Sequence, residues 1–154
     1  MAAVLNTPLV TELSAAQQTI GKSSLPFAGT IDPRAAWELF SSGEAALVDV
    51  RSAEELKFVG HVPGTLHVAW ATGTALTRNP RFVRELESKV KKDAVVLLLC
   101  RSGKRSALAA EAATKAGFTR VFNVTGGFEG ELNDKQQRGS QDGWRYEGLP
   151  WVQD

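Results

Sequence analysis

The chain has 154 residues, of which 43% are hydrophobic and 23% are charged, and its formal net charge is +1 at pH 7. This length and composition predict one compact domain with a sizeable core. The near balance of 18 basic and 17 acidic residues lacks the positive excess typical of nucleic-acid binding, so we expect no nucleic acid among the partners. A single cysteine excludes an internal disulfide and, with only two histidines, argues against a zinc site. We expect no metal and no other cofactor.

The first 30 residues predict an arm, which a loop joins to a domain spanning residues 31–154. The arm ends in GKSSLPFAGT (21–30), a stretch with the Gly, Ser and Pro content of a loop. It lacks the basic start, the apolar core and the cleavage signal of a secretory leader. No stretch of the chain approaches the ~18 apolar residues of a membrane span. We therefore expect a cytoplasmic protein without a membrane partner.

Helices and strands alternate along the predicted domain. Asp32 and Pro33 predict the N-cap and the first residue of a helix. The apolar run 45–50 predicts a strand, and Ser52 and Glu55, at the spacing of a capping box, predict that a helix follows it. The remaining expected elements are a strand at 64–70, a helix at 79–92, a strand at 94–99, a helix at 106–117 and a strand at 120–124.

This alternation indicates an α/β fold, with three α/β/α layers and a mainly parallel central sheet. The run 94–99 is apolar at every position, which is typical of a strand covered by helices on both faces. After residue 124 the pattern changes to a turn and an exposed loop rich in Gly, Asn, Asp and Gln.

The cysteine, Cys100, directly follows the most hydrophobic predicted strand. In a parallel α/β sheet, ligands bind beyond the carboxyl ends of the strands, so this is a position for a site. The five residues that lead from it into the next predicted helix are Arg101, Ser102, Gly103, Lys104 and Arg105. Their backbone N–H groups can form an anion-binding nest at the N-terminus of that helix.

This setting favours a reactive thiolate at Cys100. Three basic side chains and a helix N-terminus stabilise negative charge on the sulfur. Gly103 suits such a loop because glycine adopts positive φ without a Cβ clash. The alternative is that Cys100 is a small hydrophobic core residue, which is common for a free cysteine after a buried strand.

Three blocks of the sequence, in the same order, resemble those of rhodanese-like sulfurtransferases. LLLCRSGKRSALAA resembles their active-site loop, LVDVRSAEE with GHVPGTLHV resembles their first block, and NVTGGFEG with GLPW resembles their C-terminal block. The resemblance covers residues 31–151. It implies a rhodanese-type thiosulfate sulfurtransferase, in which Cys100 takes a sulfane sulfur as a persulfide and hands it to cyanide or a thiol. Residues 101–105 would bind the small anionic sulfur donor.

Four residues separate Cys100 from Arg105. Phosphatases and arsenate reductases related to this family have five residues between the cysteine and the arginine, in a loop wide enough for a tetrahedral oxyanion. The shorter spacing favours sulfur transfer over these two reactions. Because no second cysteine can resolve a persulfide, the sulfur must pass to an external thiol or protein acceptor. A persulfide carrier or sensor module that acts on a protein partner is the alternative.

Further residues are candidates to support the site. Asp49 and Arg51 lie at the end of a predicted strand, on the same edge of the sheet as Cys100, and we interpret them mainly as structural braces. Trp70, after the next strand, could form a wall of the site, although we favour ordinary aromatic packing for it. We interpret both histidines as structural.

An insertion, residues 131–143, interrupts the C-terminal block. The resemblance would place a tryptophan where this chain has Glu131, and Trp144 resumes the pattern. Because the insertion follows the last predicted strand, its KQQR stretch (135–138) could extend the anion-binding surface or contact an acceptor protein. A solvated loop without a function is the alternative.

Overall fold

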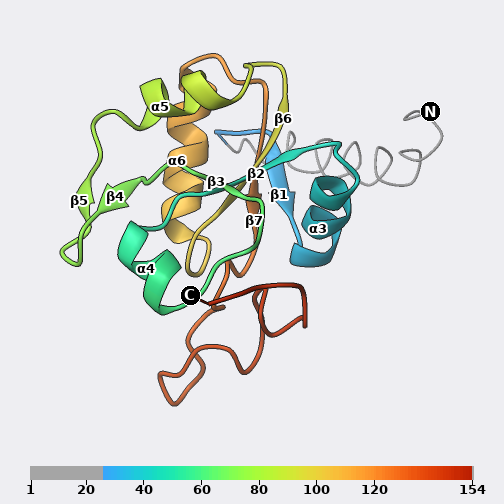
Figure 1. Cartoon of the computed structure of the whole chain (residues 1–154), viewed down its shortest axis with the longest axis vertical. Coiled ribbons are helices and arrows are strands. Elements are labelled where there is room, and N and C mark those ends of the chain that lie inside the picture. Colours follow the sequence, from blue (N-terminus) through green and yellow to red (C-terminus); the bar gives the residue numbers. More distant parts are fainter. Residues whose placement is uncertain (1–25, 154) are drawn as a thin grey trace.

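A computed structural model describes residues 26–153 of the chain (Figure 1). A five-stranded sheet lies at its centre, in the order β1-β7-β6-β2-β3, and all neighbouring strands pair in parallel. These strands are β1 (Gly29–Ile31), β2 (Ala46–Asp49), β3 (Leu66–His67), β6 (Val95–Leu99) and β7 (Arg120–Val124). The helices are α3 (Pro33–Ser41), α4 (Ala53–Phe58), α5 (Phe82–Lys89) and α6 (Lys104–Lys115), and β4 (Ala71–Thr72) pairs with β5 (Thr77–Arg78) in a separate antiparallel hairpin.

Two hydrophobic cores lie on opposite faces of the sheet. Alternate residues of β6 point to them, with Val96 and Leu98 in one core and Leu97 and Leu99 in the other. Helices α5 and α6 cover the first core, and α3 covers the second. The predicted three-layer α/β/α fold with a parallel sheet is confirmed. In the part of the chain that is described, no helix is long and apolar enough to cross a membrane.

Local signals in the sequence placed most of the elements correctly. The Asp32 side chain accepts a hydrogen bond from the Ala35 N–H at 2.9 Å and caps α3. Ser52 and Glu55 form the predicted capping box at the start of α4. Each of these caps depends on residues three positions apart in the chain, which is why the sequence alone identifies them.

Several elements differ from the prediction. The predicted strand at 64–70 is reduced to β3, because the chain then turns away into the β4–β5 hairpin. Strand β1 was not predicted, and it gains its pairing from β7, far along the chain. The helix expected from residue 79 begins at Phe82. Asn79 lies in a turn before it, and the Asn79 side chain accepts a hydrogen bond from the Arg81 N–H. Helix α6 begins at Lys104 rather than at residue 106.

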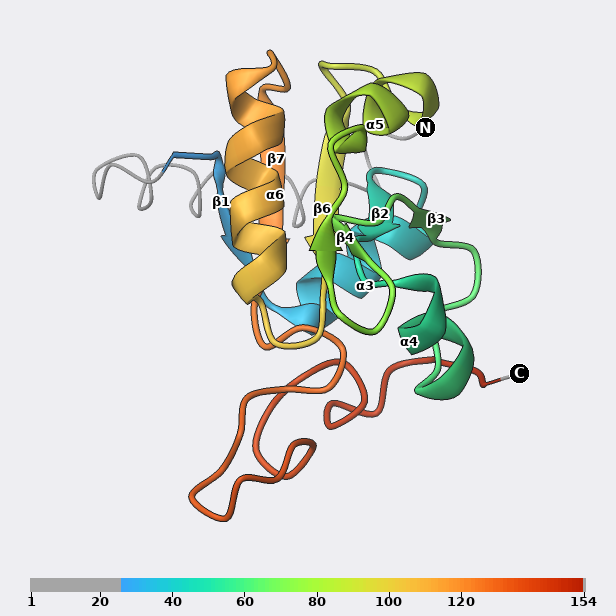
Figure 2. The same ribbon diagram turned by 90° about the vertical axis from the view of Figure 1, so that its left-hand side faces the viewer.

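The predicted arm, residues 1–30, is only partly described, since residues 1–25 lie outside the described residues. The insertion at 131–143 contains no helix or strand. Figure 2 shows the C-terminal segment that includes it, in orange and red, beyond the carboxyl ends of the strands. This is the edge of the sheet at which β6 ends and Cys100 follows.

Candidate functional site

Cys100 lies at the carboxyl end of β6, at the start of a tight loop that leads into α6 (Figure 2). Its side chain is only 1% exposed. The loop turns at Gly103, which has a φ of +104° and is the N-cap of α6. The chain therefore curls back over the sulfur within a few residues, and its backbone N–H groups face Sγ.

Three donor groups lie within hydrogen-bonding distance of Cys100 Sγ. They are the Gly103 N–H at 3.1 Å, the Ser106 N–H at 3.3 Å and the Ser106 hydroxyl at 3.2 Å. Donors directed at a sulfur stabilise it as an anion, and hydrogen bonds to a charged acceptor are stronger than those between neutral groups. The loop is thus a preformed anion-binding ring, built mainly from backbone at the first turn of α6.

Ser106 and Asn123 are site residues that the sequence analysis did not identify. Asn123, from β7, donates from Nδ2 to the Gly103 carbonyl at 3.0 Å, and its Oδ1 lies within hydrogen-bonding distance of the Ser106 hydroxyl. A hydroxyl has one proton, so Ser106 can donate either to Asn123 or to Cys100 at any moment. The signal for Asn123 was its polar side chain in the otherwise apolar stretch VFNV.

Replacing Ser106 by alanine is expected to slow alkylation of Cys100 by iodoacetamide at pH 6 about fivefold, since one hydrogen bond of about 1 kcal/mol to the thiolate is lost. The change is measured by mass spectrometry over time. Ser88→Ala, in which an exposed serine of α5 is changed, is the control and should react like the parent protein. Equal rates for Ser106→Ala and the parent would show that the hydroxyl does not stabilise the thiolate.

The basic residues of the loop do not act as one group. Arg105 forms a bidentate pair with Glu55 of α4, with N–O distances of 2.7 and 2.8 Å. Lys104 is exposed to solvent. Ser102, also predicted to bind the donor, is buried. Arg101 forms no ion pair with any residue of the described range 26–153.

The ion pair between Arg105 and Glu55 shifts the pKa of both side chains. Burial by itself raises the pKa of Glu55, but hydrogen bonds from Arg105 and the Ser52 backbone, with the charges of Arg105 and Arg51, lower it from 4.5 to about 2. The hydrogen bonds to Glu55 raise the pKa of Arg105 against the opposing effect of burial, and the negative charges of Glu55, Cys100 and Asp49 add to the shift. Arg105 therefore ties the loop to α4.

Glu55→Gln is expected to lower the free energy of unfolding by about 1.5–3 kcal/mol at pH 7, the range for hydrogen bonds to charged groups. The pKa of Glu55 is depressed in the folded state, so its ionised form stabilises the fold above about pH 4.5 and stops doing so as the pH falls towards about 2. The gap between the parent and the variant should therefore narrow below pH 4.5 in urea titrations. Glu54→Gln, in the same helical turn, is the control, and an equal loss there would assign the effect to the helix dipole instead.

Asp49 and Arg51 form a fully buried ion pair at the end of β2, with 2.8 Å between Nη2 and Oδ2. Arg51 also donates to the Gly60 carbonyl at 2.8 Å, and its guanidinium lies 4.2 Å from the centre of the Phe128 ring. The pair joins β2 to the chain before β3 and to the C-terminal segment. Neither residue donates a hydrogen bond to Cys100 Sγ.

The other aromatic and histidine candidates lie in the framework. Trp70 packs edge-on against Phe82, with Arg78 3.9 Å above its ring, and lines a groove beside α6. His67 Nε2 donates to the Arg51 carbonyl at 2.7 Å. The contacts of Trp70 are packing contacts, and the hydrogen bond of His67 is made to the backbone.

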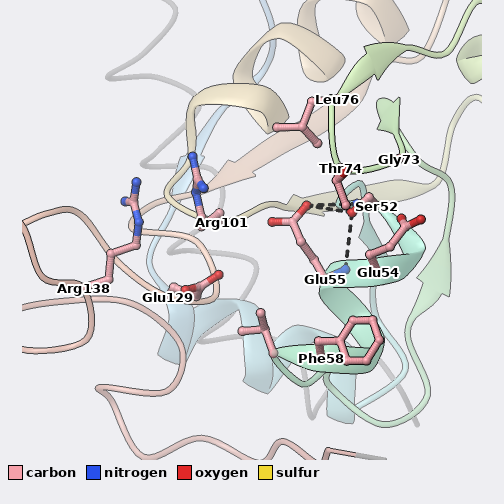
Figure 3. Close-up of a pocket in the computed structure, with 11 residues that line it drawn as sticks. Ser52, Glu54, Glu55, Phe58, Gly73, Thr74, Leu76, Arg101, Glu129 and Arg138 are labelled. Carbon is pink, nitrogen blue, oxygen red and sulfur yellow. Dashed lines mark hydrogen bonds between the residues drawn. The ribbon is translucent and has the colours of Figure 1, made fainter.

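A pocket of about 410 Å³ borders the Cys100 loop (Figure 3). Its walls come from α4, from the turn of the β4–β5 hairpin, and from Arg101, Glu129 and Arg138. We call it the Arg101–Arg138 pocket. Arg138 belongs to the insertion, and its Nη1 donates to the Gly130 carbonyl at 2.8 Å. The other members of the KQQR stretch are exposed and do not line this pocket.

The described residues include no group of three or more His, Cys, Asp or Glu side chains that could hold a metal ion. The chemistry available at the site is that of one buried sulfur, a ring of hydrogen-bond donors and a parallel sheet that fixes both. These features place a buried cysteine, surrounded by hydrogen-bond donors, at the carboxyl edge of a parallel α/β sheet.

Comparison with known proteins identifies the family. A model of the rhodanese-like domain matches residues 32–133. The chain belongs to the rhodanese-like family, and the resemblance seen in the sequence is confirmed. The crystal structure of Rv0390 from M. tuberculosis superposes with a TM-score of 0.75 and 44% identity, over 83% of this chain and 99% of that one.

Two curated bacterial relatives align over most of their own length. An uncharacterized protein of Rickettsia rickettsii, the RP600 homolog, is 36% identical over 118 residues, which cover 73% of this chain and 87% of the relative. The thiosulfate sulfurtransferase GlpE of Actinobacillus pleuropneumoniae is 29% identical over 120 residues, which cover 78% of this chain and 89% of that enzyme.

Proposed function

We propose that this protein is a thiosulfate-type sulfurtransferase that carries a sulfane sulfur on Cys100 as a persulfide. The observation that carries the proposal is the ring of donors around Cys100 Sγ, in a loop where four residues separate Cys100 from Arg105. Such a ring stabilises the attacking thiolate. The family membership and the similarity to GlpE support the same reaction.

The reaction has two steps, in which the sulfur atom is conserved. The Cys100 thiolate attacks the outer sulfur of thiosulfate, a bond forms between Sγ and that sulfur, and the bond to the sulfonate breaks, so that sulfite leaves with the electron pair. An acceptor thiol then gives its proton to the persulfide, which was formed as an anion, and the resulting acceptor thiolate attacks the outer sulfur of the protonated persulfide. The bond to Sγ breaks, and Cys100 is regenerated as a thiolate.

Only part of the predicted cationic cradle is free to bind the donor. Arg105 is neutralised by Glu55, so Arg101 is the loop cation that we assign to the incoming anion, with Lys104 contributing from the surface. A small thiol, cyanide or a protein that accepts the sulfur would complete the cycle. An external acceptor is needed because Cys100 is the one cysteine of the chain. We place the reaction in the cytoplasm, where thiols are kept reduced.

Intact-mass measurement after exposure to thiosulfate tests this proposal. We expect a gain of about 32 Da, one sulfur atom, that cyanide removes and that Cys100→Ser lacks. Parallel assays use an aryl phosphate and arsenate. No mass gain, a gain that survives Cys100→Ser, or clear turnover of either oxyanion would contradict the assignment.

A further inference from the structure

The Arg101–Arg138 pocket has charges that the rest of the protein does not neutralise. Arg101, Arg138, Glu54 and Glu129 all line it, and none of them forms an ion pair within residues 26–153. The Nε atom of Arg101 is buried and has no hydrogen-bond partner among these residues. Charged groups that are left unpaired in a recess are complementary to a charged ligand.

One wall of the pocket carries both positive and negative side chains. Figure 3 shows Arg101, Arg138 and Glu129 on this wall, with Glu54 and the Ser52 and Thr74 side chains on the other. Leu76 and Phe58, which is 68% exposed, border the space between the two walls. A ligand that fits has a negative group and a positive group close together, facing the wall of Arg101, Arg138 and Glu129, and a short uncharged part that extends from them.

The insertion holds Arg138 in this position. The Asn133 side-chain oxygen accepts hydrogen bonds from the N–H groups of Lys135 and Gln137, both at 2.9 Å, which closes the turn before Arg138. Arg138 Nη1 is fixed on the Gly130 carbonyl, which leaves Nη2 and Nε for a ligand. The pocket thus combines a residue next to the nucleophile, Arg101, with a residue that the insertion supplies.

We propose that the Arg101–Arg138 pocket binds the sulfur acceptor and selects a small zwitterionic thiol, of the amino-acid type. Its carboxylate binds Arg101 and Arg138, and its ammonium group binds Glu129 on the same wall. The thiol points towards the Cys100 loop, which borders the pocket through Arg101. This inference rests on the proposed function and specifies which acceptor receives the sulfur.

The transfer step needs no further reactant. The acceptor thiolate forms a bond to the outer sulfur of the Cys100 persulfide, whose proton stays on that sulfur, and the electron pair of the broken bond returns to Sγ. The products are the Cys100 thiolate and the persulfide of the acceptor. Binding the remote end of the acceptor raises the effective concentration of its thiol at the persulfide.

Four thiols that differ only in their charged groups test the pocket. They are L-cysteine, with both charges, 3-mercaptopropionate, with the carboxylate alone, cysteamine, with the ammonium group alone, and 2-mercaptoethanol, with neither. The protein is loaded with thiosulfate, freed of excess donor and mixed with each thiol, and the loss of about 32 Da is followed over time. For each thiol, we take the concentration that gives half of the maximal transfer rate. The value for a variant is divided by the value for the parent protein, and this ratio cancels the intrinsic reactivity of the thiol.

Arg138→Gln is expected to raise this ratio about tenfold for L-cysteine and 3-mercaptopropionate, the two thiols with a carboxylate, relative to the other two. A tenfold change corresponds to the loss of one hydrogen bond between charged groups. Glu129→Gln should do the same for L-cysteine and cysteamine. Arg84→Gln, an exposed arginine of α5 outside the pocket, is the control and should leave all four ratios near one. Equal ratios for the four thiols in both pocket variants would overturn the inference.

Binding of S-methyl-L-cysteine, which cannot accept sulfur, separates this inference from the proposed function. It is followed by NMR on the unloaded protein, and the shifts should fall on pocket residues and weaken in Arg138→Gln. A protein that binds this probe but never gains sulfur would refute the sulfurtransferase assignment and keep the pocket. A protein that gains sulfur but does not bind the probe would refute the pocket alone.

Discussion

Replacing Asp49 by valine is expected to lower the free energy of unfolding by about 3–5 kcal/mol, because the substitution leaves the charge of Arg51 buried without a partner. Both side chains are fully buried. The Asp49 carboxylate accepts hydrogen bonds from Arg51 Nε and Nη2 and also from the Arg51 backbone N–H at 3.0 Å. The remaining contacts of the guanidinium, the Gly60 carbonyl and the Phe128 ring, do not neutralise it. Urea unfolding followed by tryptophan fluorescence measures the loss.

The double variant Asp49→Val/Arg51→Met is the matched control. It removes both charges and keeps apolar volume at both positions, a change that is often neutral when a buried pair is replaced. We expect it to be clearly more stable than Asp49→Val alone, although it has one more substitution. If the double variant is no more stable than the single one, the unpaired charge is not the cause of the loss.

Gly127→Ala is expected to reduce the rate of sulfur transfer by about 100-fold, the order of loss that a displacement of about 1 Å causes at an active site. A Cβ atom at Gly127 would lie 2.5 Å from the carbonyl oxygen of Cys100 and 2.5 Å from the carbonyl carbon of Arg101. Both neighbours are backbone, so the start of the Cys100 loop itself must move. The next residue, Phe128, donates its N–H to the Cys100 carbonyl at 2.7 Å, so this contact would be disturbed as well.

Gly148→Ala separates crowding from backbone strain. Gly148 has a φ of +76°, close to the +62° of Gly127, but an added Cβ atom there meets nothing within 4 Å. Both variants carry the cost of a left-handed alanine, about 1–2 kcal/mol, and only Gly127→Ala displaces the loop. Single-turnover rates from the persulfide to cyanide compare the two. Similar losses of rate in both would mean that backbone strain alone explains the effect.

Signals between neighbouring residues of the chain predicted the position of Cys100 and the tight turn that follows it. Cys100 is placed at the edge of the sheet by an apolar run directly before it, and the tight turn is set by Gly103, so both follow from adjacent residues. The loop cations show the limit of this reasoning. Consecutive residues of a turn point in different directions, so Arg101 faces the pocket, Lys104 faces solvent and Arg105 faces α4.

The unpredicted contacts join residues that are distant in the chain. The partner of Arg105 is Glu55, 50 residues earlier, and the partner of Ser106 is Asn123, 17 residues later. Such pairs depend on which strands are neighbours and in what register, and here the parallel pairing of β6 and β7 brings Asn123 beside the loop. A periodicity along one chain contains no information on that register.

The insertion leaves and rejoins the domain at nearly one point. A Cβ atom on Gly143 would lie 2.6 Å from the Gly130 nitrogen, and the Glu131 N–H donates to the Asp142 carboxylate at 2.8 Å. Beyond this closed neck the chain can lengthen or shorten at low cost, since doubling a loop adds about 0.6 kcal/mol of closure entropy. The wall that carries Arg138 can therefore change in evolution, and with it the acceptor that we propose the pocket selects, while Cys100 and its hydrogen-bond donors stay in place.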